Sequence, residues 1–212
     1  MSAPGNFYQS VRMLLTVGIA ITVILCFFIF PADASAQLRA QTAPADLDQL
    51  VHNAATILRG NVISAAIEPH PQFSNIQTVV VTISVSRVLK GEPSTTYTFR
   101  QFVWDIRDTA DVAGYRKAGE LLLFLNPNSP YGLTSPVGLD QGRFRVMRDP
   151  KGKAFAVNGR ANLGLFNQVP NKAASRGVTF SQQVQAMMAK PQRQVPLDSL
   201  EDAIITLAGG RK

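Results

Sequence analysis

The side chains best suited to bind a ligand are basic and follow one another on a predicted β-hairpin. Arg143 and Arg145 occupy alternate positions of its first strand, so both should leave the same face if the apolar residues between them point inward. Lys151 and Lys153 follow just across a predicted tight turn. The planar guanidinium group suits carboxylates and phosphates. The sequence therefore predicts that this hairpin binds an acidic partner, either an acidic protein or an anionic envelope polymer.

A second candidate surface lies on a longer predicted hairpin, residues 77–104. Arg100, Phe102 and Trp104 share one phase of its second strand. Small β-barrels bind ligands on an exposed strand face and its adjoining loops, where basic and aromatic groups suit an oligosaccharide or an acidic peptide. In the alternative interpretation, Phe102 and Trp104 belong to the core and the arginines simply face solvent.

Known catalytic and metal-binding patterns are absent from the sequence. His52 and His70 are the only histidines, and neither has further ligands at the spacing of a zinc site. Asp105, Asp108 and Asp111 recur at intervals of three, whereas EF-hand ligands occupy alternate positions. We therefore expect no metal and no cofactor, and a non-catalytic protein is favoured over an enzyme.

The N-terminus has the features of a secretory signal peptide. A basic residue precedes an uncharged apolar run over residues 13–30, and Ala34 and Ala36 form a small-residue cleavage site before Gln37. We expect residues 1–36 to be removed and the mature protein to be periplasmic or extracellular. Because the apolar run is about long enough to cross a bilayer, a retained anchor that leaves the domain facing outside is the alternative.

Composition sets limits on the rest of the chain. The 212 residues are 46% hydrophobic and 17% charged, with a net charge of +7. Such a basic chain favours anionic surroundings, although it contains no nucleic-acid-binding motif. Its single cysteine, Cys26, lies in the apolar run, so the mature chain would have no disulfide and no thiolate ligand. One domain of ordinary size can form a sufficient core without them.

Apolar periodicity predicts a mainly β protein of the α+β class. Alternating or continuous apolar runs predict strands at residues 57–67, 77–89, 97–103, 120–125, 142–149 and 153–157, with a further short strand at 131–135. Gly60 should mark a bulge or a close backbone approach. The phase of the apolar positions changes near Arg87, which predicts a β-bulge there. In the second hairpin, Phe155 and Val157 are expected to point inward.

Helices are predicted at both ends of the domain. Asp46 should cap the first, which follows a flexible leader at 37–45. Thr179 should cap a second helix, and residues 197–207 form a third pattern that ends at glycines. Residues 158–178 are rich in Asn, Gly and Ala, and we expect them to loop over the surface.

Three short segments come in a recognisable order: Ile57–Val62, Val85–Gly91 and Gly119–Leu125. Their order resembles the netrin-like domain, whose best-known members are the tissue inhibitors of metalloproteinases. It also resembles a group of secreted bacterial proteins of unassigned function. The resemblance implies a small OB-like antiparallel β-barrel over residues 46–159, closed or nearly closed, with the C-terminal helices of residues 160–212 packed on it.

The inhibitory function of that family does not carry over. Those inhibitors chelate the catalytic zinc of their target through an N-terminal cysteine held by disulfides, whereas the expected mature N-terminus here is Gln37. The sequence therefore favours an exported, non-catalytic binding or interaction module of the cell envelope. The alternative is an extracytoplasmic hydrolase with an unrecognised carboxylate site, which a pocket joining Asp105, Asp108 or Glu120 to His70 would favour.

Overall fold

A computed structural model describes residues 43–103 and 114–209 of the chain. Several sequence predictions concern residues outside these ranges and stay predictions. They are the signal segment 1–36 with Ala34, Ala36 and Gln37, most of the leader 37–45, and the side chains of Trp104, Asp105, Asp108 and Asp111.

One seven-stranded antiparallel sheet dominates the described residues, in the order β3-β2-β1-β4-β5-β6-β7. Its strands are β1 (Thr56–Pro69), β2 (Gln77–Lys90), β3 (Thr96–Phe102), β4 (Glu120–Leu125), β5 (Arg143–Arg148), β6 (Ala154–Asn158) and β7 (Val195–Pro196). The sheet is open, with β3 and β7 at its two ends. The predicted mainly β, α+β class is confirmed.

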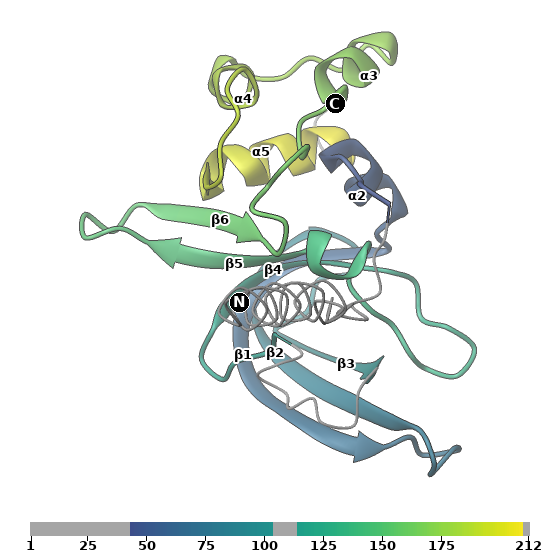
Figure 1. The fold of residues 1–212 in the computed structure, drawn as a ribbon. Coiled ribbons are helices and arrows are strands. Elements are labelled where there is room, and N and C mark those ends of the chain that lie inside the picture. Colours follow the sequence, from purple (N-terminus) through teal and green to yellow (C-terminus); the bar gives the residue numbers. More distant parts are fainter. Residues whose placement is uncertain (1–42, 104–113, 210–212) are drawn as a thin grey trace, which may run out of the picture. The chain divides into compact units, whose positions relative to one another are not determined.

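The long strands β1 and β2 are strongly curved (Figure 1), and their irregular pairing explains why. Gly60 pairs with Val85 while Arg59 pairs with Arg87, so Ser86 is an extra residue that forms a bulge. A side chain at Gly60 would place its Cβ 2.2 Å from the carbonyl oxygen of Ser84. The bulge predicted near Arg87 and the close approach predicted at Gly60 are both confirmed.

The segment between β4 and β5 forms isolated bridges with β3 and with β4. Leu133 forms an isolated parallel bridge with Arg100 of β3, and Pro136 forms an isolated antiparallel bridge with Leu125 of β4. The short strand predicted at 131–135 is therefore wrong: this segment is a turn followed by single bridges. We call residues 133–136 the bridging segment.

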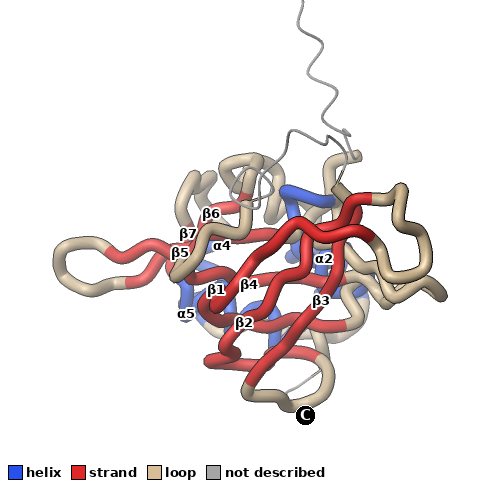
Figure 2. The backbone as a smooth tube through the Cα atoms, turned by 90° about the horizontal axis from the view of Figure 1, so that it is seen from below, coloured by secondary structure: helices blue, strands red, loops and turns tan. Residues whose placement is uncertain are grey.

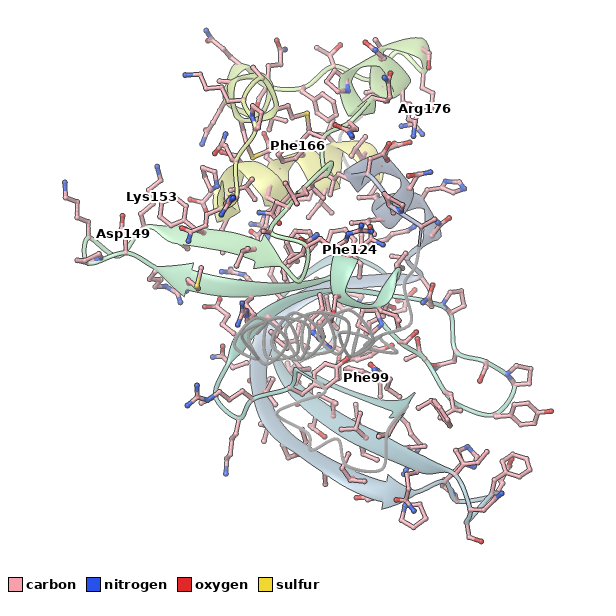
Figure 3. The ribbon with its side chains drawn as sticks, in the orientation of Figure 1. Phe99, Phe124, Asp149, Lys153, Phe166 and Arg176 are labelled. Atoms are coloured by element: carbon pink, nitrogen blue, oxygen red, sulfur yellow. The ribbon has the colours of Figure 1, made fainter. Side chains whose placement is uncertain are left out.

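Strand β4 is buried on both faces, as its continuous apolar sequence predicts. Leu122 and Phe124 join one apolar cluster, here called the helix-side cluster. Leu121, Leu123 and Leu125 join a second, the strand-side cluster, which is formed mainly by residues of β1–β4. Figure 3 shows Phe124 and Phe99, one member of each cluster.

Four α-helices in the described residues supply most of the helix-side cluster: α2 (Leu47–Asn53), α3 (Val169–Ser175), α4 (Gln182–Met188) and α5 (Leu197–Leu207). They gather on one side of β5 and β6 (Figure 1). Asp46 caps α2 through a capping box with Gln49, as predicted. The cap of α4 is Ser181 and not Thr179. No helix in the described ranges is both long and apolar enough to cross a bilayer.

The segment 158–178 is not a surface loop, contrary to the prediction. It contains α3 and buries Leu165, Val169 and Ala173 in the helix-side cluster. The side chain of Asn162 donates to the carbonyls of Ala156 and Arg193 and accepts from the backbone N–H of Asn158. Asparagine amides thus satisfy the buried backbone groups of an irregular segment, which allows it to lie inside.

The phase predicted for β6 is also wrong. Ala156 and Asn158 are buried on the helix side, while Phe155 and Val157 are only half-buried on the opposite face. The register decides this outcome, because Asn158 pairs with Phe144 and must share its buried face. Small side chains on the helix side of β6 also let α5 approach the strand closely.

Candidate functional site

The structure places the predicted ligand-binding residues on two separate surfaces. Arg100 lies on the outer face of β3, whereas Arg143, Arg145, Lys151 and Lys153 lie on the β5–β6 hairpin.

Arg100 is held between two neighbouring strands. Its Nη1 donates to Thr78 Oγ1 at 2.6 Å and lies 3.4 Å from the carbonyl oxygen of Pro69. Its Nη2 pairs with the half-exposed carboxylate of Glu68 at 3.3 Å. The guanidinium is therefore oriented by the end of β1 while part of it stays open to solvent. Because these contacts already hold the Arg100 side chain in one conformation, binding a polar ligand would cost it little further conformational entropy.

Hydroxyl groups continue along the same outer face. Thr82 pairs across the strands with Thr98, and their Oγ1 atoms are 3.1 Å apart. Ser84 and Thr96 form the next pair along the ribbon. The outer face of β2 and β3 therefore presents several groups that can both donate and accept hydrogen bonds.

An aromatic cluster lies where two segments meet close to Arg100, which contacts the carbonyl oxygen of Pro69 on one and forms a bridge with Leu133 on the other. The ring of Phe73, from the β1–β2 loop, lies 5.5 Å edge-on from that of Tyr131, which follows β4. His70 stacks on Phe73 with ring centroids 5.1 Å apart. Tyr131 is 58% exposed and Phe73 is 39% exposed, so both rings are available to a ligand.

His70 is a structural residue that fastens these loops together. Its Nδ1 accepts from the backbone N–H of Gln72 at 3.2 Å, and its Nε2 lies 2.9 Å from the carbonyl oxygen of Tyr131. This pattern requires the neutral tautomer with the proton on Nε2. We call the outer faces of Thr82, Thr98 and Arg100 together with the rings of Phe73 and Tyr131 the β2–β3 surface.

A shallow depression of about 200 Å³ adjoins this surface between β3 and the bridging segment. Phe102, Leu133 and Thr134 contribute to its lining. Phe102 is exposed, so the core alternative does not apply to it. Of the two aromatic residues predicted on this strand, Phe102 lies at the surface and Trp104 lies outside the described residues.

On the hairpin, Arg143 is not a free surface arginine. Its guanidinium lies 5.2 Å from the ring centroid of Tyr115 and pairs with Asp140, and only 16% of its side chain is exposed. The hydroxyl of Tyr115 donates to Gln101 Oε1, and burial of this phenol raises its pKa to about 12. Arg143 therefore stabilises the turn before β4. It shares a face with Arg145 as predicted, because both flank the inward-facing Phe144. The prediction that both guanidinium groups are open on an outer surface is wrong, since that of Arg143 is covered.

The other three cations predicted to bind a ligand are exposed as expected: Arg145, Lys151 and Lys153. The carboxylate of Asp149 accepts the backbone N–H groups of Lys151 and Lys153, both at 2.9 Å, which confirms the tight turn. Lys153 Nζ lies 5.5 Å from the ring centroid of Phe155. Figure 3 shows Asp149 and Lys153 near the end of this hairpin.

Sequence reasoning missed a chain of alternating charges on the helix side of the sheet. Arg59 pairs with Glu120 at 3.2 Å and with Glu201 of α5 at 3.0 Å. Glu201 also pairs with Arg87, and Glu120 with Arg148, each at 2.5 Å. Arg59, Arg87 and Glu120 belong to the three segments that carry the netrin-like resemblance, so those segments contribute the polar contacts of one network.

A signal for this network was present in the sequence of α5. Glu201 lies three residues before Ile204 and four after Leu197, which places its carboxylate on the apolar stripe of the helix. It is only 1% exposed. A buried acid requires a cationic partner, so its position predicts an arginine or lysine facing α5.

This arrangement does not favour the hydrolase alternative. Glu120 is held by Arg59 and Arg148, while His70 belongs to the separate aromatic cluster. Within residues 43–103 and 114–209, no three His, Cys, Asp or Glu side chains come together as a potential metal site. Among the groups described, the β2–β3 surface and the basic hairpin are suited to non-covalent binding.

Comparison of the chain with protein-family models, with curated proteins and with solved structures found no match.

Proposed function

We propose that this chain is an exported, non-catalytic binding module of the cell envelope that binds an oligosaccharide on its β2–β3 surface. In this proposal the domain is an OB-like barrel similar to the netrin-like domains. The observation that carries the proposal is the combination of two exposed aromatic rings with an ordered arginine and a row of hydroxyl groups.

The pairing of the strands supports the OB-like architecture. β3, β2, β1 and β4 are consecutive neighbours in the sheet. The parallel bridge from Arg100 to Leu133 and the antiparallel bridge from Leu125 to Pro136 would complete a ring of five segments around the strand-side cluster. OB-type barrels bind oligosaccharides and oligonucleotides on the face of their second and third strands, between the loops that follow strands one and four. The aromatic cluster joins those same two loops.

The chemistry of the surface suits a sugar chain. Pyranose rings have apolar C–H faces that pack on aromatic rings such as those of Tyr131 and Phe73. Their hydroxyl groups exchange hydrogen bonds with threonine and serine hydroxyls and accept from guanidinium groups. The partly exposed Arg100 would also engage an acidic sugar. Small ligand sites commonly combine apolar contact area with a few such fixed polar groups.

The test is retention of the protein on insoluble cell-wall glycan and on an array of soluble oligosaccharides. Replacing Tyr131 with alanine should reduce affinity about two- to tenfold, because an aromatic packing contact contributes about 0.5–1.5 kcal/mol. Leu163→Ala is the matched control, since Leu163 is 72% exposed and distant from this surface in sequence. The proposal fails if the unaltered protein binds no glycan, or if both variants bind as well as it does.

A further inference from the structure

The β5–β6 hairpin extends beyond the strands that hold its base. β5 pairs with β4 only through Arg143–Arg145, opposite Leu121–Leu123. β6 pairs with β7 only at Phe155 and Ala156. The rest of the hairpin, around the turn at Asp149, projects away from the sheet as a two-stranded ribbon (Figure 2).

One face of this ribbon is apolar at its centre. Met147 pairs across the strands with Phe155, and Arg145 pairs with Val157, so all four side chains share the face opposite the helices. Met147 is 38% exposed, and Phe155 and Val157 are half-buried. Phe155 and Val157 lie here rather than in the core because the phase of β6 is the opposite of the predicted one.

Cations surround the apolar residues. Arg145, Lys151 and Lys153 are exposed. Arg148 pairs across the strands with Ala154, so its half-exposed side chain leaves the opposite face, where it pairs with Glu120. The only acidic residue of the ribbon is Asp149, whose carboxylate is already used by the backbone N–H groups of the turn. The ribbon therefore presents a small apolar centre with a strongly positive rim.

We infer that this ribbon docks on the surface of an anionic lipid bilayer, with Met147 and Phe155 against the headgroup layer and the basic side chains among lipid phosphates. Stable protein interfaces bury about 1,000 Å² or more of complementary surface, whereas the apolar part of this face is limited to Met147, Phe155 and Val157. Binding to a bilayer needs no matching shape, only apolar contact and clustered cations. Lys153 over the Phe155 ring is suited to this role, because its flexible stem can lie along the apolar face while its ammonium reaches the phosphates.

The test places a solvent-sensitive fluorophore on the ribbon of the full chain. The label is attached at Met147→Cys in a chain that also carries Cys26→Ser. Vesicles of phosphatidylcholine alone are compared with vesicles that also contain phosphatidylglycerol. We expect a blue shift with the anionic vesicles only, and loss of the shift in high salt. The same label at Ala174→Cys, on the exposed side of α3, should not shift. Because the readout is local, membrane insertion by other parts of the chain does not produce it.

A charge-matched pair of variants separates this docking from general attraction. Lys151→Glu with Lys153→Glu should raise the anionic lipid concentration needed for half-maximal shift by tenfold or more, since each cation near such a surface contributes about fivefold. Lys190→Glu with Arg193→Glu gives the same net charge at two exposed positions outside the ribbon, and should have a much smaller effect.

Three results would overturn the inference. Equal weakening by both double variants would mean that net charge alone attracts the protein. An equal shift with neutral vesicles would mean that anionic lipid is not recognised. A shift produced by soluble polyglutamate but not by vesicles would identify the hairpin as a site for an acidic polymer.

Discussion

The two faces of β4 bury apolar side chains in different ways. The strand-side cluster is formed by residues 58–125, within β1–β4 and their connections. The helix-side cluster collects residues from Leu47 to Ile204, including three helices that are only seven residues long. Strand pairing positions the first cluster, whereas the second depends on contacts between distant parts of the sequence.

The polar groups of the two regions differ in the same way. On the strand side, Tyr115 bonds to Gln101, and Arg143 lies over the ring of Tyr115. On the helix side, buried amides and the alternating chain of charges connect α5 to four strands. Short helices have little stability of their own, so we infer that these long-range polar contacts determine where the helices dock.

The largest expected effect tests the strand-side cluster. Ile83→Ala removes a fully buried side chain from β2 and should reduce the free energy of unfolding by about 2–5 kcal/mol. Val80→Ala, at a half-exposed position on the outer face of the same strand, is the control and should cost less. Urea denaturation measures both. Equal losses would mean that the two faces of β2 do not differ in packing.

A smaller effect is expected for the charge network on the helix side. Glu201→Gln keeps the shape of the side chain but removes the charge between Arg59 and Arg87, and should cost about 1–3 kcal/mol. Asp198→Asn, at an exposed position in the first turn of α5, should cost under about 1 kcal/mol. A more stable Glu201→Gln variant would show that the network, like some buried ion pairs, is not needed for stability.

The smallest effect separates the two arginines that the sequence treats alike. Arg143→Gln loses the ring of Tyr115 and the carboxylate of Asp140, and should cost about 1–2 kcal/mol in thermal or urea unfolding. Arg145→Gln is exposed and should change stability by less than about 0.5 kcal/mol. Equal effects would contradict the structural role assigned to Arg143.

Much of the strand-side region was predictable from local sequence. Val79, Val81 and Ile83 recur at every second position and are fully buried, although Val85 at the bulge is only half-buried. The run at 120–125 is buried on both faces, as its lack of alternation indicates. These predictions succeed because successive side chains of a strand point to opposite faces of the sheet, so the spacing of apolar residues shows directly which face is buried.

The candidate sites were less predictable, because local periodicity does not say which face of a hairpin meets the core. The β5–β6 hairpin has apolar residues in both phases. Its pairing with β4 turns Phe144 toward the core, and the pairing of β6 with β5 places Ala156 on the same buried face. The aromatic cluster joins two loops more than fifty residues apart in the sequence, His70 and Phe73 on one and Tyr131 on the other. Neither loop shows a pattern that indicates its partner.

The sequence by itself determined the mainly β class, the capped helix at Asp46, the bulge near Arg87 and the burial of β4, since each depends on neighbouring residues alone. Only the tertiary structure decided that the Asn-rich segment enters the core, that Arg143 turns toward Tyr115 and that Glu201 joins Arg59 to Arg87. The physical reason is that buried polar groups must find partners. Those partners are distant in the sequence and are brought close only by packing, so the spacing of residues along the chain does not identify them.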